Sequence, residues 1–415
     1  MSQKASHDGG ADLGTQPSRF APLGVVGFRW LVSAQLVSEI GDWAARVALQ
    51  LLVLERTGNA ALSALVIAVS LAPWIGLGQV LASIGDRYPR RTVLIVCDLS
   101  RAIIFLIIAA VEVPTGVVLL LAFLAGCFDP PFEASRSALI PQLVGTSIYG
   151  HALALSAYVS NLGLLSGYVL GGGLSGWLGP RGALLVNAAT FVLSSFLVSR
   201  LPNEAGNPLR RPDVRAAVRF ILSDRVVLSS VVVYGLVAFF GMSVEGIAAP
   251  YGVDELALSN AGVGLLLAMV PAGTIVGTLA MRADGSDRRL LRLSGLAALL
   301  AGGLALPVFW LELTGLLPFV GFFGIGISFA ASIPTNTAAG RRIPAEIRAS
   351  TFGIRQGGVV GAHALGAATG GLVANRISLD FAATLGAATL LSLGLLILLV
   401  TPVLTPEQDW RVREN

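Results

Sequence analysis

Apolar residues fill long stretches of this chain, and short polar connections separate them. A helix needs about 20 mostly apolar residues to cross the hydrocarbon core of a bilayer. The stretches lack the period-two alternation of barrel strands, and lipid leaves only helices or closed barrels as spanning structures. The pattern therefore predicts twelve transmembrane helices, over residues 29–54, 60–83, 92–112, 115–139, 150–174, 180–200, 226–250, 259–281, 290–310, 313–337, 347–374 and 378–401.

The longest polar stretch, residues 201–225, divides these segments into two sets of six. It holds three prolines and five arginines, a composition typical of a linker. We expect this organisation: a cytoplasmic tail over 1–27, a six-helix bundle over 28–200, a cytoplasmic linker over 201–225, a second six-helix bundle over 226–401 and a cytoplasmic tail over 402–415.

The two sets share a pattern of proline and charge. Pro73 precedes Asp86 by thirteen residues, and Pro271 precedes Asp284 by the same number. Further pairs recur in the same order: Pro131 and Pro141 match Pro334 and Pro344, and Arg90 and Arg91 match Arg288 and Arg289. This repetition indicates a duplicated six-helix unit. Parallel repeats with a site between them near the midplane describe a class of secondary transporters.

Charge is scarce and unevenly placed. Only 13% of residues are charged, against about 25% in a typical soluble domain, which argues against a soluble enzyme. All basic residues except Lys4 are arginines, and most lie in the even-numbered connections, whereas the odd-numbered ones hold Arg56, Arg181 and Arg376. The positive-inside rule then predicts a multi-pass protein of the plasma (inner) membrane with both termini cytoplasmic. Because topology accounts for the net charge of +4, we infer no nucleic-acid partner.

The connection after the second segment carries a specific pattern. It reads Gly85-Asp86-Arg87-Tyr88-Pro89-Arg90-Arg91. It resembles the signature loop of the major facilitator superfamily, G-x-x-x-D-R-x-G-R-R, with Ala82 and Pro89 in place of two glycines. The resemblance implies an all-α polytopic membrane protein of two pseudo-symmetric six-helix bundles. It also implies that Asp86, Arg87, Arg90 and Arg91 latch the bundles at the cytoplasmic face; a basic loop that only fixes topology is the alternative.

The fifth segment contains glycines at regular spacing: Gly163, Gly167, Gly171 and Gly172. They resemble the antiporter motif of the same superfamily, G-x-x-x-G-P-x-x-G-G, with Tyr168 in place of proline. This resemblance implies export, and ordinary packing of small residues is the alternative. Residues 38–43, 97–102 and 128–141 resemble the macrolide-efflux and siderophore-exporter branch of the drug:proton antiporters.

Ionisable residues inside membrane segments are costly, so each is a functional candidate. Glu39, Asp42 and Arg46 have the spacing i, i+3 and i+7, which places them on one helix face that we expect to line a central cavity. Glu39 is the first candidate for proton coupling, and a fixed ion pair with Arg46 is the alternative. Glu245 lies towards the outer end of the seventh segment, where it either lines the cavity or reaches water.

A second set of charges lies near the predicted cytoplasmic ends of the third, fourth and eleventh segments. We expect it to form a gate network with Asp86 and Arg90, in which Arg355 pairs with Asp86 or Asp129 across the bundles. Snorkelling of long side chains to the surface is the alternative. The members of this set are Asp98, Arg101, Asp129, Arg136 and Arg355.

The sequence shows no nucleophile–base pair, no metal-ligand spacing and no phosphate-binding loop. We therefore expect no enzyme activity, no cofactor and no metal. The predicted function is proton-coupled export of an amphipathic small molecule (a drug, antibiotic or siderophore-like compound) by alternating access, from a monomer in contact with membrane lipid. An importer or lipid transporter of the same fold stays open as an alternative, as does a polytopic membrane sensor or enzyme.

Overall fold

The computed structural model describes Ser18 and residues 20–145, 148–202, 214–281, 285–344 and 346–404. Over these ranges the chain forms helices and no strand. They are α1 (Val26–Thr57), α2 (Ala60–Leu71), α3 (Gly78–Ala82), α4 (Ile84–Arg87), α5 (Arg90–Ala110), α6 (Thr115–Gly126), α7 (Asp129–Val144), α8 (Tyr149–Val198), α9 (Val214–Ser223), α10 (Arg225–Glu245), α11 (Ala248–Pro250), α12 (Asn260–Ala280), α13 (Asp287–Trp310), α14 (Leu317–Phe329), α15 (Ser332–Gly340), α16 (Arg348–Arg376) and α17 (Leu379–Leu404). Three short turns of helix join them: η1 (Ala21–Gly24), η2 (Ala72–Trp74) and η3 (Tyr251–Glu255).

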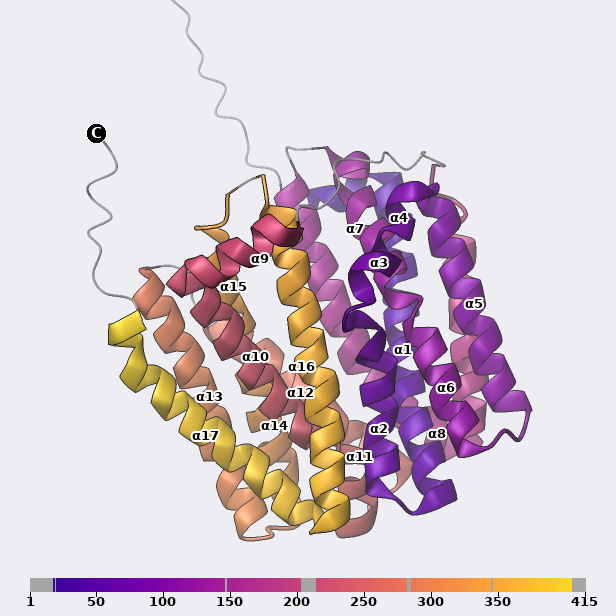
Figure 1. Ribbon diagram of the computed structural model, residues 1–415. Helices are drawn as coiled ribbons and strands as arrows, with labels where there is room; N and C mark the ends of the chain where they lie inside the picture. Colours follow the sequence, from indigo (N-terminus) through magenta and orange to yellow (C-terminus); the bar gives the residue numbers. More distant parts are fainter. Residues whose placement is uncertain are drawn as a thin grey trace, which may run out of the picture.

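The long helices stand side by side in two groups (Figure 1). The first group, α1 to α8, fills one side of the molecule, and the second group, α9 to α17, fills the other. Helices α4 and α9 lie at one end of the molecule, which we name the arginine-rich end, and α11 lies towards the opposite, arginine-poor end.

Within the described ranges, nine helices are long and apolar enough to cross a membrane, by length and composition. They do not include α1, which carries Glu39, Asp42 and Arg46 within eight residues, or the short α2. Helix α8 is counted once among the nine, although it covers two expected segments. Its backbone leaves helical geometry at Gly179, where φ is +72°. The fold is thus an all-helical polytopic membrane fold, and the count of twelve spans stays a prediction.

Several of the expected segments are interrupted. The segment expected over 60–83 breaks after α2, because Pro73 lacks an N–H group and Gly76 has a φ of +76° that favours glycine. The segment expected over 115–139 breaks between α6 and α7, where Pro130 and Pro131 begin the new helix. The repeat partner of Pro131, Pro334, lies in the first turn of α15 after a matching break.

The two groups share apolar contacts. Val47 and Tyr168 of the first group belong to the same buried cluster as Val263 and Phe309 of the second. Elsewhere α2 packs on α10 and α16 in a cluster that includes Ile67, Met242 and Ala364. Large apolar side chains also remain on the outside, as at Leu279, which is 72% exposed. A lipid-facing surface explains this exposure, which water would penalise.

Candidate functional site

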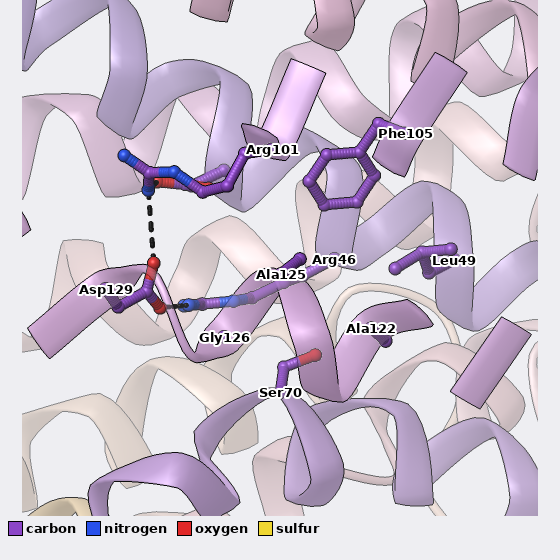
Figure 2. Close-up of a pocket in the computed structure, with 10 residues that line it drawn as sticks. Arg46, Leu49, Ser70, Arg101, Phe105, Ala122, Ala125, Gly126 and Asp129 are labelled. Carbon is purple, nitrogen blue, oxygen red and sulfur yellow. Dashed lines mark hydrogen bonds and ion pairs between the residues drawn. The ribbon is translucent and has the colours of Figure 1, made fainter. Parts of the chain in front are cut away.

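Arg101 of α5 lies at the centre of a charged cluster inside the first group. Its Nη1 atom donates to Asp42 Oδ2 at 3.0 Å and to Asp129 Oδ1 at 3.1 Å, and its Nη2 atom donates to Asp98 Oδ1 at 2.8 Å. The second oxygen of Asp129 accepts from Arg46 Nη2 at 3.5 Å, so Asp129 lies between the two guanidinium groups (Figure 2). Helices α1, α5 and α7 are joined through these four ion pairs.

Aromatic rings enclose the centre of this cluster. The guanidinium carbon of Arg101 lies 4.6 Å from the ring centroids of both Phe132 and Phe191, and the Arg101 side chain is only 2% exposed. Asp98 is fully buried. With all groups ionised, three carboxylates face two guanidinium groups, so the cluster carries one net negative charge. Buried charges of this kind tolerate the loss of a partner poorly.

A small cavity opens beside the cluster. Its charged lining residues are Asp42, Arg46, Arg101 and Asp129. Leu49, Phe105 and residues of α2 and α6 complete the lining (Figure 2). Its volume of about 20 Å³ is enough for about one water molecule and lies far below that of ligand pockets, which span roughly 300–1,000 Å³. Every lining residue comes from the first group. The cavity therefore suits water better than a drug-sized molecule.

Glu39 lies outside this cluster, although it shares α1 with Asp42 and Arg46. Its Oε1 atom accepts from Ser160 Oγ of α8 at 2.9 Å, and its Oε2 atom accepts from Trp43 Nε1 at 3.3 Å. Among the described residues no cation lies within ion-pair distance of this carboxylate. The expected alternative, a pair between Glu39 and Arg46, is not formed, because Arg46 is bound to Asp129.

The three charged side chains of α1 thus do not face one cavity between the groups. Asp42 and Arg46 point towards Arg101 and Asp129, inside the first group. Glu39 points towards α8. The i, i+3, i+7 spacing spreads the three side chains over an arc of the α1 surface. Different neighbouring helices can contact different parts of that arc.

A chain of hydrogen bonds extends from Glu39 towards the arginine-rich end. Ser160 Oγ accepts from Gln35 Nε2 at 2.7 Å, and Gln35 Oε1 accepts from Ser156 Oγ at 2.8 Å. Ser156 Oγ in turn accepts from Arg136 Nη1 at 2.6 Å. Arg136 is held by Glu133 at 2.6 Å, one turn away on α7. Hydrogen-bonded polar side chains thus connect Glu39 to α7 without interruption.

Glu245 of α10 forms a buried contact between the groups. The Tyr168 hydroxyl of α8 donates to Glu245 Oε1 at 2.5 Å. Both side chains are almost inaccessible, with exposed fractions of 2% for Tyr168 and 5% for Glu245. The rings of Trp43 and Tyr168 pack in a T-shaped arrangement, with 5.3 Å between their centroids. Glu245 therefore faces a tyrosine of the other group and not open water.

The glycines of the antiporter-like motif let α8 approach two helices. Added Cβ atoms on Gly163 and Gly167 would lie 2.5 Å and 2.6 Å from the Cβ atoms of Glu39 and Trp43, and one on Gly171 would lie 2.7 Å from Ala44 Cα. Gly172 faces the second group, where its added Cβ would lie 2.5 Å from Gly264 Cα. Three glycines thus serve packing on α1, and one serves packing between the groups.

At the arginine-rich end, Arg90 and Arg91 bind backbone carbonyls of their own group. Arg90 Nη1 donates to Ala138 O at 3.0 Å, and Arg91 Nη1 donates to Leu201 O at 3.1 Å. Arg87 is exposed on α4. The side chain of Asp86 lies outside the part of the chain that the structure describes, so the latch expected there stays a prediction.

The expected gate set is distributed over three places. Asp98, Arg101 and Asp129 meet in the cluster, and Arg136 joins the hydrogen-bond chain. Arg355 of α16 is buried, 5.4 Å from the ring of Phe352, and forms no ion pair within the described ranges. Arg101 and Arg46 occupy the Asp129 carboxylate that was one of its two expected partners.

In the second group, Arg342 forms an ion-pair bridge that sequence reasoning did not predict. This residue follows α15 and contacts Asp287 Oδ2 at 2.8 Å and Asp224 Oδ2 at 3.3 Å. Burial alone would lower the pKa of Arg342, but its bonds to the two carboxylates outweigh that effect and raise it. The bridge ties the starts of α10 and α13 together.

The partners of Glu39 also escaped sequence reasoning. Gln35 and Glu39 are four residues apart on α1, and Ser156 and Ser160 are four apart on α8. The signal that could have revealed them was a matching pair of polar residues, spaced i and i+4, in each of two apolar segments.

Within the described ranges, no group of three or more histidine, cysteine, aspartate or glutamate side chains could hold a metal ion.

Comparison with known proteins identifies the family. The Major Facilitator Superfamily profile matches residues 31–360. YfiS of Bacillus subtilis (strain 168), an uncharacterised MFS-type transporter, is 23% identical over 395 residues, which are 90% of this chain and 93% of YfiS. A protein named multidrug efflux pump Tap, from Mycolicibacterium fortuitum, is 28% identical over 217 residues, about half of each chain.

Solved structures share the fold. A bacterial homologue of the human lysosomal transporter Spinster, in an inward-facing and unoccupied conformation, matches with a TM-score of 0.69 at 15% identity, over 94% of this chain and 97% of the homologue. The nucleoside transporter NupG matches with a TM-score of 0.70 at 13% identity, over 92% of this chain and 100% of NupG. The chain therefore belongs to the Major Facilitator Superfamily and is a multi-pass membrane transporter, not an enzyme.

Proposed function

We propose that this transporter exports an amphipathic small molecule in exchange for protons, by alternating access between the two groups of helices. The observation that carries the proposal is the environment of Glu39. Its carboxylate lies within α1 and accepts hydrogen bonds from a serine and a tryptophan, both uncharged. It can therefore gain or lose a proton without breaking an ion pair.

The carboxylates of the charged cluster serve less well. Asp42, Asp98 and Asp129 are all held by Arg101, and protonating any of them would weaken an ion pair. Their role in this account is structural, because they fix α1, α5 and α7 relative to one another. Glu39, by contrast, is linked through Trp43 to Tyr168, which contacts Glu245 of the second group.

Export is supported by the relatives and by the resemblance of three stretches of the sequence to exporters. The Tap proteins of Mycolicibacterium fortuitum and Mycobacterium tuberculosis (strain ATCC 25618 / H37Rv) carry the name multidrug efflux pump and are 28% and 25% identical over their matched regions. Residues 38–43, 97–102 and 128–141 resemble the macrolide-efflux and siderophore-exporter branch. The apolar surfaces where the groups meet suit a substrate that is partly apolar.

The proposed topology places the arginine-rich end in the cytoplasm of the cell, with the protein acting as a monomer in the plasma (inner) membrane. The positive-inside rule supports this orientation. The first group would then correspond to the bundle over 28–200 and the second to the bundle over 226–401, with the linker over 201–225 between them. Residues 203–213 of that linker lie outside the described part of the chain. The residues that follow them form helix α9.

A susceptibility and efflux panel tests the function. Cells with and without the protein are exposed to amphipathic drugs, antibiotics and siderophore-like compounds, and retained compound is measured with and without a protonophore. The proposal expects lower retention of at least one compound when the protein is present, and loss of that difference when the proton gradient is collapsed. A difference that survives the protonophore contradicts proton coupling, and higher retention contradicts export.

A further inference from the structure

The hydrogen bond between Tyr168 and Glu245 lies at the inner edge of a seal between the groups. On its arginine-poor side, Gln50 Nε2 of α1 donates to Gly246 O at 3.1 Å, and Asn260 Nδ2 of α12 donates to Ser175 O at 3.4 Å. Gly172 and Gly264 meet there backbone to backbone. These contacts all cross from one group to the other. The structure is therefore closed on the arginine-poor side of Glu245.

The surroundings of Glu245 are almost without charge. Tyr168 faces it from α8, and the charge of Arg46 of α1 acts on it; the Arg46 guanidinium carbon lies 4.3 Å from the centroid of the Trp43 ring. Glu39 reaches the same Trp43 from α1. Helices α16 and α17 approach α10 at this level through glycines, Gly370 and Gly386, which bring no charge. Within the described ranges, no cation lies within ion-pair distance of Glu245.

Burial of this kind has a different free-energy cost for the ionised and the protonated form of the Glu245 carboxyl group. An ionised carboxylate removed from water is costly unless a cation neutralises it. A protonated carboxyl needs only hydrogen-bond partners, and the Tyr168 hydroxyl supplies one. When the seal parts during alternating access, Glu245 would meet water, where the ionised form carries no such cost.

We propose that Tyr168 and Glu245 form a proton-dependent lock: the arginine-poor side closes after Glu245 takes up a proton there, and it opens again as the proton is released. Glu245 is then a second proton-binding site, and Tyr168 is its positioning residue. The inference rests on the proposed function in that the two groups must part and close.

The hydrogen bond to Glu245 explains why tyrosine, and not the proline of the antiporter motif, stands at position 168. A proline at this position would supply no hydroxyl group to Glu245. Trp43 then connects the two carboxyls, because it donates to Glu39 and packs in a T-shaped arrangement with Tyr168. Movement of Tyr168 when the lock opens would therefore reach the hydrogen bond of Glu39.

Spin-label distances across the seal test the lock. Labels are placed by Trp177→Cys and Leu316→Cys, at positions that are 81% and 80% exposed near the arginine-poor ends of the two groups, in a full-length parent in which Cys97 and Cys127 are alanine. Distances are measured by double electron–electron resonance in lipid nanodiscs, without substrate, at mildly acidic and mildly alkaline pH. The lock predicts that the short-distance population grows on acidification.

Three variants decide the outcome. Glu245→Gln keeps a neutral hydrogen-bonding group and should hold the short distance at both pH values. Tyr168→Phe leaves Glu245 buried without its partner and should lower the closed-to-open ratio about tenfold at acidic pH. Tyr158→Phe, an exposed tyrosine of the same helix, should behave like the parent.

Persistence of the pH response in Glu245→Gln would overturn the proposal, as would a Tyr168→Phe variant that matches Tyr158→Phe. Because substrate is absent, this measurement is independent of the export assay. Loss of proton-coupled export with an intact pH response would refute the proposed function and leave the lock standing. Proton-coupled export with no pH response of the distances would refute only the lock.

Discussion

Gly172 of α8 and Gly264 of α12 bring the two groups into backbone contact: a Cβ atom on Gly172 would lie 2.5 Å from Gly264 Cα and 2.6 Å from Asn260 O. Real Cβ atoms do not approach backbone so closely, so any larger residue must push the helices apart. Such close crossing is how membrane helices gain packing energy without a hydrophobic driving force. The closed arginine-poor side depends on this pair.

Gly172→Ala should therefore disfavour the closed arginine-poor side. The expected result is faster labelling of a Ser175→Cys reporter by a membrane-impermeant thiol reagent, since Ser175 is buried beside the crossing. Gly173→Ala is the matched control, because an added Cβ at Gly173 meets no atom within 4 Å. Equal labelling rates in the two variants would contradict the role given to Gly172.

Arg101→Gln should destabilise the protein strongly. It leaves the carboxylates of Asp42, Asp98 and Asp129 without their shared partner, and loss of one side of a buried ion pair costs about 3–5 kcal/mol. Thermal unfolding in detergent measures the effect. Adding Asp98→Asn to Arg101→Gln should recover part of the loss, because Asp98 is the most deeply buried of the three.

A control ion pair lies near the surface at the arginine-poor end. Arg181 and Glu112 are 3.0 Å apart, and Glu112 is 85% exposed. Arg181→Gln should change stability by less than about 1 kcal/mol, because exposed pairs contribute little. If Arg101→Gln unfolds at the same temperature as Arg181→Gln, the cluster does not hold α1, α5 and α7 together.

Asp224 has two separable functions at the start of α10. Its Oδ1 atom caps the helix by accepting from the backbone N–H groups of Val226 at 2.9 Å and Val227 at 3.0 Å, and its Oδ2 atom pairs with Arg342. Asp224→Asn keeps the cap and loses the charge, whereas Asp224→Ala loses both. Thermal unfolding should place Asp224→Ala about 1 kcal/mol below Asp224→Asn. Equal stability of the two variants would show that the cap contributes nothing.

The long apolar stretches predicted the class of fold correctly, because the bilayer requires long apolar helices with internal hydrogen bonding. They did not predict the breaks after α2 and α6. Pro73 interrupts its segment, whereas the repeat partner Pro271 lies inside an unbroken α12. Proline removes one donor in either place, but Gly76 with its positive φ lets the chain turn only near Pro73.

The candidate residues were recognised one by one, while their partners were not. Charge inside apolar segments identified Glu39, Asp42, Arg101 and Glu245. Which of these meet depends on how α5, α7 and α8 pack around α1, and helical spacing on one chain segment carries no such information. Tyr168 illustrates the point. In the sequence it is recognised only as a departure from the proline of the antiporter motif, whereas in the structure it is the hydrogen-bond partner of Glu245.

The central claim is that Glu39 carries the coupled proton, and proton movement in proteoliposomes tests it most directly. Purified protein is reconstituted with a pH-sensitive dye, an exported compound is added, and Glu39→Gln is compared with Glu112→Gln, whose side chain is exposed. The account predicts that Glu39→Gln abolishes substrate-driven proton movement while substrate binding stays detectable, and that Glu112→Gln matches the unmodified protein. Substrate-driven proton movement of normal size in Glu39→Gln would contradict the account.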